Sequence, residues 1–172
     1  MNLPEKFEAL IITLSDRAFA GEYKDMSGLR IREKLSDFFK SRNWTCNIEM
    51  IIIPDDADQL KTLLKKAMHK NNIIITTGGT GIGPKDITVE SVRPLLSKEM
   101  PGIMEFIRVK YGTGNPGALL SRGVAGIIGN ALIYTLPGSV RAVNEYMTEI
   151  LVTLEHTLMM QYGIDTHGAI SK

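Results

Sequence analysis

The sequence has a single cysteine, Cys46, among 172 residues. One cysteine excludes an internal disulfide and is typical of proteins in a reducing cytoplasm, which is where we expect this one. Strong charge of either sign is also lacking, because 20 lysines and arginines face 19 aspartates and glutamates. This balance argues against a general affinity for nucleic acids or anionic membranes, so an anionic substrate must be attracted locally.

Long apolar runs are missing as well. No stretch of about 18 apolar residues occurs, so we expect no membrane-spanning helix. The N-terminus lacks the basic start and long apolar core of a signal peptide. Repeats, linkers and low-complexity tracts are absent too. We therefore predict one domain over residues 1–164, followed by a disordered tail over residues 165–172.

Apolar and amphipathic segments alternate along the chain, which is typical of an α/β fold. The expected strands cover residues 7–14, 44–53 and 73–75, and the expected helices cover residues 27–41, 57–70, 88–96, 101–111 and 139–162, with Ser27, Thr88 and Ser139 as candidate N-caps. Two short apolar runs between residues 118 and 134 flank Gly129-Asn130, a dipeptide suited to a hairpin turn. The prediction is a three-layer α/β/α sandwich with a mostly parallel central sheet and a small β-hairpin excursion near residues 118–135.

The most informative stretch is IIITTGGTGIGPKD, residues 73–86. Three isoleucines describe a strand buried on both faces, and the glycines that follow can point several backbone N–H groups at one anion. A Walker A loop is excluded, because the stretch ends in Gly-Pro-Lys-Asp, and the dinucleotide fingerprint is excluded because Pro84 replaces its third glycine. We interpret the stretch as a phosphate-binding loop; a glycine-rich turn without a ligand is the alternative.

Carboxylates follow three successive predicted strands, at Asp16, Asp55-Asp56 and Asp86. Ligands of open α/β sheets bind beyond the carboxyl ends of the strands, where these side chains should lie. Carboxylates beside an amide cradle can hold Mg²⁺ against phosphate oxygens, which suits phosphoryl or nucleotidyl transfer. The alternative is that Asp16, Asp55 and Asp56 are turn or capping residues.

Several separate motifs resemble those of the molybdenum cofactor biosynthesis family, the group of the bacterial molybdopterin adenylyltransferase and the corresponding G domains of eukaryotic molybdenum cofactor proteins. They are SDRAFAGEYKDMSG (15–28), IPDD (53–56), TTGGTGIGPKDIT (76–88), MPG (100–102), LSR (120–122) and LPGS (136–139). Their order and spacing extend the resemblance over nearly the whole chain.

The resemblance implies an enzyme, a nucleotidyltransferase that moves AMP from Mg·ATP to the terminal phosphate of molybdopterin and releases pyrophosphate. A partner protein then inserts molybdate, and the family is typically a homotrimer. Asp55 and Asp86 match the two essential carboxylates and are the implied Mg²⁺ ligands. The implied substrate-binding residues are Ser15, Asp16, Arg17, Thr77, Gly78, Gly79, Thr80, Gly81, Lys85, Ser121, Arg122, Pro137, Gly138 and Ser139.

The sequence departs from the family pattern at two positions. Val89 stands where proline is common, and Ile128 stands where active members often carry arginine. The ending LPGSVRA also resembles a branch without clear catalytic activity, so a non-catalytic molybdopterin- or nucleotide-binding protein is the second hypothesis. A molybdate-inserting relative is the third, but such proteins carry this domain in a longer chain, for which 172 residues leave no room. The SDR, LSR and Asp86-Ile87-Thr88 segments favour the enzyme.

Overall fold

The computed structural model describes residues 2–164, so the tail predicted over residues 165–172 lies outside the described residues. Its centre is a six-stranded sheet in the order β2-β1-β3-β6-β5-β4. The strands are β1 (Lys6–Leu14), β2 (Thr45–Ile53), β3 (Ile73–Thr77), β4 (Lys98–Glu99), β5 (Ala125–Ile128) and β6 (Ala131–Leu136). The helices are α1 (Asp16–Phe19), α2 (Met26–Ser41), α3 (Ala57–Ala67), α4 (Thr88–Val92), α5 (Pro101–Gly112) and α6 (Val140–Gln161), with 3₁₀ turns η1 (Arg93–Leu95) and η2 (Pro116–Leu120).

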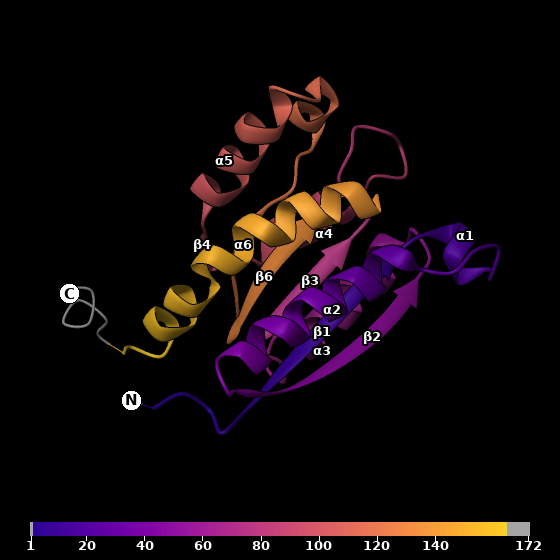
Figure 1. Ribbon diagram of the computed structural model, residues 1–172. Coiled ribbons are helices and arrows are strands. Elements are labelled where there is room, and N and C mark those ends of the chain that lie inside the picture. The colour runs from indigo at the N-terminus through magenta and orange to yellow at the C-terminus, as the bar shows by residue number, and fades with distance from the viewer. Residues whose placement is uncertain (1, 165–172) are drawn as a thin grey trace.

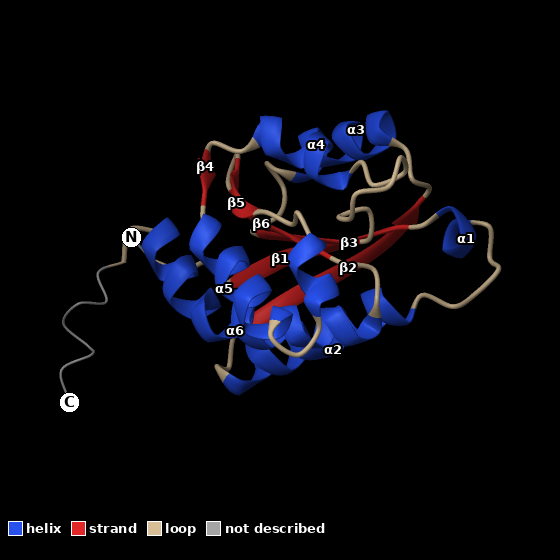
Figure 2. Ribbon diagram, turned by 90° about the horizontal axis from the view of Figure 1, so that it is seen from above, coloured by secondary structure: helices blue, strands red, loops and turns tan. Residues whose placement is uncertain are grey.

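Helices cover both faces of the sheet (Figures 1 and 2), with α2, α5 and α6 on one side and α3 and α4 on the other. Strands β2, β1, β3 and β6 are parallel. Successive residues of β1 point to opposite faces, so Ile11 packs with α2 and α6 while Ile12 packs with α3 and α4. Burial on both faces is the reason why β1 and β3 read as continuous apolar runs. The predicted three-layer, mostly parallel architecture is confirmed.

The predicted hairpin exists, but it is not an excursion from the sheet. β5 pairs antiparallel with β6, and β6 in turn pairs with β3 in the centre of the sheet. Gly129 turns the chain with φ of +51°, a conformation that favours glycine. The first strand of the hairpin, β5, begins at Ala125, which is later than the predicted start near residue 118. Residues 116–120 form the 3₁₀ turn η2 instead. The strand β4, which pairs with β5, was not predicted.

Several helix boundaries differ from the prediction. Asp25, not Ser27, caps α2, because its carboxylate accepts the N–H of Gly28 at 2.9 Å and the Ser27 hydroxyl instead donates to the carbonyl of Gly138. Helix α4 stops at Val92 and continues only as η1, where Pro94 disfavours further α-helix. The short helix α1, which lies between the expected strand 7–14 and the expected helix 27–41, was not predicted.

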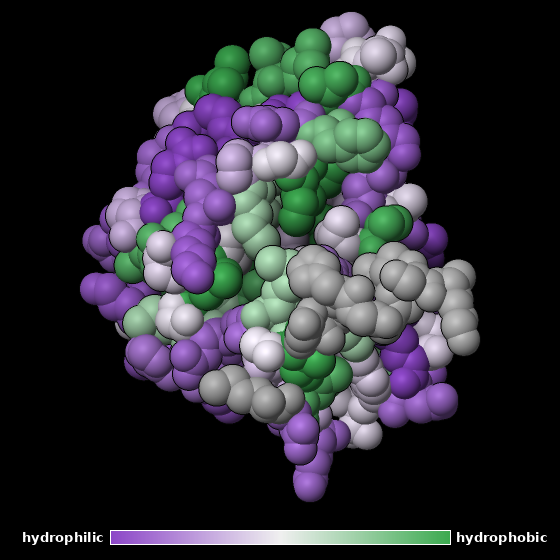
Figure 3. All heavy atoms as spheres, turned by 90° about the vertical axis from the view of Figure 1, so that its left-hand side faces the viewer, coloured by the Kyte–Doolittle hydropathy of each residue, from purple (hydrophilic) through white to green (hydrophobic). Residues whose placement is uncertain are grey.

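Helix α5 is only half buried. Met104 and Ile107 pack in the core, while Phe106 and Val109 are 55% and 66% exposed. Figure 3 shows apolar side chains gathered at the end of the molecule that α5 forms. In residues 2–164, no helix is both long and apolar enough to cross a membrane.

Ser139 caps α6 as predicted, accepting a hydrogen bond from the N–H of Ala142 at 3.2 Å. We expect Ser139→Ala to lower the free energy of unfolding by about 1 kcal/mol, because the cap is lost. Ser139→Asp is the matched control: aspartate caps equally well and should leave the stability within a few tenths of a kcal/mol. Urea denaturation of the three proteins measures the difference. Equal stability of the alanine variant and the parent would contradict this assignment.

Candidate active site

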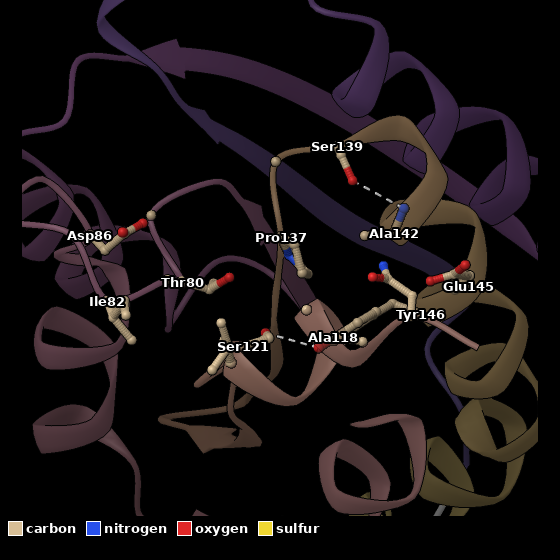
Figure 4. A pocket seen from close by; sticks show the side chains of 16 residues that line it. Thr80, Ile82, Asp86, Ala118, Ser121, Pro137, Ser139, Ala142, Glu145 and Tyr146 are labelled. Carbon is tan, nitrogen blue, oxygen red and sulfur yellow. Dashed lines mark hydrogen bonds between the residues drawn. The ribbon is translucent and has the colours of Figure 1, made fainter. Parts of the chain in front are cut away.

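Two adjoining cavities lie beyond the carboxyl ends of β1, β3 and β6. One of about 370 Å³, here called the tyrosine cavity, is shown in Figure 4. The other, of about 330 Å³, is here called the carboxylate cavity. They share Gly79 and Asp86. A larger hollow of about 740 Å³ lies at the amino ends of the strands, but none of the predicted site residues lines it.

In the glycine loop, residues 78–83, the orientation of the N–H groups follows from hydrogen bonds to the carbonyl groups of residues 78–81. Thr88 binds the first two carbonyls of residues 78–81, through its hydroxyl at 2.9 Å and its N–H at 3.0 Å. Arg122 binds the last two, through its N–H at 2.9 Å and its Nε at 2.7 Å. A trans peptide aims N–H opposite to C=O, so the N–H groups of residues 79–82 face away from these anchors. No described residue accepts a hydrogen bond from them, which leaves four donors for an anion.

Two of the loop glycines are required by their surroundings. Gly78 has φ of +100°, and a Cβ there would lie 2.3 Å from the carbonyl oxygen of Leu14. Gly79 has φ of +66°, and its Cβ would lie 2.4 Å from the Thr88 hydroxyl. Any larger residue would therefore push β3 away from β1 or break the Thr88 anchor. The glycines serve the close packing of the loop as well as its N–H groups.

The turns after β1 and β2 are tied together by their aspartates. The Asp16 N–H donates to Asp55 Oδ2 at 3.2 Å, and the Asp55 N–H donates to Asp16 Oδ1 at 3.0 Å. Lys85 crosses from the glycine loop and forms an ion pair with Asp16. This ion pair, together with the Asp55 N–H, lowers the pKa of Asp16 below its ordinary value, so Asp16 stays ionised at neutral pH.

Asp55 and Asp86 each keep a free carboxylate oxygen. Asp86 Oδ2 accepts the N–H of Gly83 at 2.8 Å, and Asp55 Oδ2 accepts that of Asp16. In neither residue does Oδ1 accept a hydrogen bond from the described part of the chain. Within residues 2–164, no three histidine, cysteine, aspartate or glutamate side chains are grouped to hold a metal alone. The donor set instead fits Mg²⁺, which commonly binds one or two carboxylates together with phosphate oxygens and water.

The tyrosine cavity is more apolar and is built around α6. The Tyr146 hydroxyl hydrogen-bonds Ser121 Oγ at 2.9 Å (Figure 4). Burial raises the pKa of Tyr146 above its ordinary value, so the phenol stays neutral. Neither Tyr146 nor the neighbouring Glu145 and Asn115 was predicted. For Tyr146 a clue was present: it follows Ser139 at the i, i+7 spacing that places two helical residues on one face.

The structure brings most of the predicted residues together around the two cavities. The tyrosine cavity holds Gly79, Thr80, Gly81, Asp86, Ser121, Pro137, Gly138 and Ser139. The carboxylate cavity holds Ser15, Asp16, Arg17, Asp55, Gly79, Lys85 and Asp86. Thr77, Gly78 and Arg122 line neither cavity. Thr77 is buried and donates to the carbonyl of Pro137 at 2.8 Å, so it joins the ends of β3 and β6.

Comparison with known proteins gives the family. The family described as "Probable molybdopterin binding domain" matches residues 10–156. The chain belongs to it. The molybdopterin adenylyltransferase of Pyrococcus furiosus is 34% identical over 160 residues, covering 90% of this chain and 91% of the relative. The molybdenum cofactor synthesis protein cinnamon of Drosophila melanogaster is 37% identical over 150 residues, 86% of this chain, but the chain spans only 24% of that protein's length.

Solved structures of this family have the same fold. The crystal structure of the molybdopterin biosynthesis enzyme MoaB from Thermus thermophilus has a TM-score of 0.80 and 36% sequence identity to this chain. The match covers 91% of this chain and 97% of that one. The resemblance to the molybdenum cofactor biosynthesis family is therefore confirmed at the level of family and fold.

The two departures from the family pattern lie in the core. Val89 and Ile128 are 2% and 0% exposed. Ile128 pairs with Ala131 at the start of β6, whereas the cavities lie beyond Leu136 at its end. Five residues of strand separate these points by about 17 Å. Ile128 therefore lies far from both cavities and lines neither of them.

Proposed function

We propose that the chain is a molybdopterin adenylyltransferase. The observation that carries the proposal is the row of four unused N–H groups, residues 79–82, beside the free carboxylate oxygens of Asp55 and Asp86. A cradle for phosphate beside carboxylates for a divalent cation is what nucleotidyl transfer requires of a protein. The names of relatives similar over nearly their whole length support the same reaction.

The two cavities suit the two substrates. We place the pterin in the tyrosine cavity, whose walls are more apolar, and the ATP phosphates in the carboxylate cavity. The reacting phosphates then meet at Gly79 and Asp86, which belong to both cavities. The N-terminus of α6, at Ser139, adds a partial positive charge beside the phosphate of the pterin substrate.

In the proposed reaction an oxygen of the terminal phosphate of molybdopterin attacks the α-phosphorus of ATP. The bond from that phosphorus to the bridging oxygen breaks, and pyrophosphate leaves with the electron pair. A phosphate monoester is largely dianionic at neutral pH, so no protein base is needed. Asp55 and Asp86 would hold Mg²⁺, which supplies charge neutralisation for the phosphates. The N–H groups of residues 79–82 stabilise the charge that grows on the α-phosphate.

The experiment is to incubate the protein with molybdopterin and ATP and to measure pyrophosphate. We expect release that equals ATP consumption, requires both molybdopterin and Mg²⁺, and stops when EDTA removes the metal. The second hypothesis, a binding-only protein, is motivated by the LPGSVRA ending. Molybdopterin binding without pyrophosphate release would favour it. We further propose, on the family resemblance, a homotrimer that passes its product to a molybdate-inserting partner.

A further inference from the structure

Arg122 holds the glycine loop at three points, although it lines neither cavity. Its backbone N–H donates to the carbonyl of Thr80 at 2.9 Å. Its Nε donates to the carbonyl of Gly81 at 2.7 Å, and its Nη2 donates to that of Asp86 at 3.2 Å. The two side-chain contacts therefore fix both ends of the segment 81–86. This segment carries the last of the unused N–H groups and the Asp86 carboxylate.

The guanidinium itself is fixed by Glu90 of α4. Nη1 pairs with Glu90 Oε1, and Nη2 lies 3.3 Å from Oε2. A guanidinium has five N–H donors, and with the two carbonyls and the two carboxylate oxygens four of them are used. The flat fork also sets the angle at which the side chain meets the loop, which a lysine ammonium would not do. Little capacity remains in Arg122 to bind a substrate phosphate directly.

We propose that Arg122, fixed by Glu90, is a positioning residue for the phosphate-binding loop and for Asp86, not a substrate ligand. The inference rests on the proposed function, because it assigns a role in presenting groups to the phosphates. By holding the Gly81 carbonyl, Arg122 aims the N–H of Ile82 the other way, as the planar trans peptide requires. By holding the Asp86 carbonyl, it sets the backbone from which the proposed Mg²⁺ ligand projects.

The first test uses pyrophosphate as a probe and needs no turnover. Arg122→Lys keeps the positive charge and the backbone N–H but loses the fork. Arg93→Lys is the matched control, because Arg93 forms an exposed ion pair with Glu99 and lines neither cavity. In ¹H–¹⁵N NMR titrations with Mg²⁺ present, pyrophosphate should shift the amides of residues 79–82 of the parent protein. We expect its affinity to fall about tenfold or more in Arg122→Lys and to be unchanged in Arg93→Lys.

The second test separates kcat from KM. Arg122→Lys should lower kcat about tenfold or more and raise the Mg²⁺ concentration for half-maximal rate, while the KM for molybdopterin changes less than about threefold. Glu90→Gln leaves Arg122 able to bind the carbonyls of Gly81 and Asp86 but removes the charge that fixes its guanidinium. It should therefore lower kcat and raise the Mg²⁺ requirement in the same way, but less. Glu90→Gln also keeps the proposal testable if Arg122→Lys does not fold, because a parent-like kcat and Mg²⁺ response in it would then overturn the role.

The outcomes distinguish this inference from the proposed function. The proposed function fails if pyrophosphate does not shift the amide signals of residues 79–82 in the parent protein and the parent releases no pyrophosphate from ATP. If the parent does both and Arg122→Lys behaves like the parent, the positioning role is overturned while the function stands. If Arg122→Lys mainly raises the KM for molybdopterin, Arg122 contacts the substrate, and the positioning role is likewise overturned.

Discussion

Asp86→Asn and Asp55→Asn are each expected to lower kcat about 10²- to 10³-fold, as loss of an electrostatic contact to the transition state does. The fold should be unaffected, because an asparagine oxygen can still accept the N–H of Gly83 or of Asp16. What each variant loses is the negative charge of the carboxylate whose Oδ1 is proposed to bind Mg²⁺. Steady-state pyrophosphate release, with thermal unfolding of each variant, measures both expectations.

Asp58→Asn is the matched control for this pair. It removes the same charge from the first turn of α3, outside both cavities, and should leave kcat unchanged. Parent-like rates in both Asp55→Asn and Asp86→Asn would remove the carboxylates from the mechanism. A loss of rate accompanied by unfolding would mean instead that they serve the structure.

Gly78→Ala is expected to destabilise the fold by about 3 kcal/mol and to abolish turnover. The added Cβ would lie 2.3 Å from the backbone oxygen of Leu14, in a conformation with φ of +100°. Left-handed backbone costs about 1–2 kcal/mol for a residue with a Cβ, and overpacking costs about 1–3 kcal/mol more. The loop must then move, which displaces the N–H groups of residues 79–82. Urea denaturation and pyrophosphate release measure the two effects.

Two control variants divide this effect into its parts. Gly21→Ala adds a Cβ with φ of +76° but with no atom within 4 Å, so it should cost only the conformational part. Gly102→Ala, at the start of α5, has neither problem and should be neutral or slightly stabilising. If Gly78→Ala lowered the free energy of unfolding no more than Gly21→Ala does, the steric conflict with the Leu14 carbonyl would be disproved.

The sequence was sufficient for the parallel part of the sheet, and for placing most of the candidate site residues at one edge of it, because both depend on local patterns. The isoleucines of β3 predicted a strand buried on both faces, and the glycines after it predicted the turn that exposes N–H groups. Asp55 and Asp86 could be placed at one sheet edge because parallel strands bring their carboxyl ends together. The cap of α2 was misplaced since Asp25 and Ser27 are both good capping residues. The contact that favours Asp25 comes from β1, where the Thr13 hydroxyl donates a hydrogen bond to the Asp25 carboxylate at 2.6 Å.

Contacts across long stretches of chain could not be predicted in the same way. Arg122 was assigned to the substrate because it follows a serine in a family motif. Its structural partners, Gly81 and Glu90, are 41 and 32 residues away in the sequence, and nothing local to Arg122 points to them. Tyr146 was overlooked since a tyrosine at helical spacing usually belongs to the core, and it is indeed 2% exposed. Its hydroxyl bonds Ser121, which directly follows η2 and lines the tyrosine cavity with it.

The most direct test of adenylyl transfer is to follow the two ends of ATP separately. The protein is incubated with molybdopterin, Mg²⁺ and ATP labelled with ³²P at either the α or the γ position. We predict that the α label appears in a pterin product and the γ label in pyrophosphate, in equal amounts. Label from the γ position in the pterin, or no transfer of either label despite bound molybdopterin, would contradict the account.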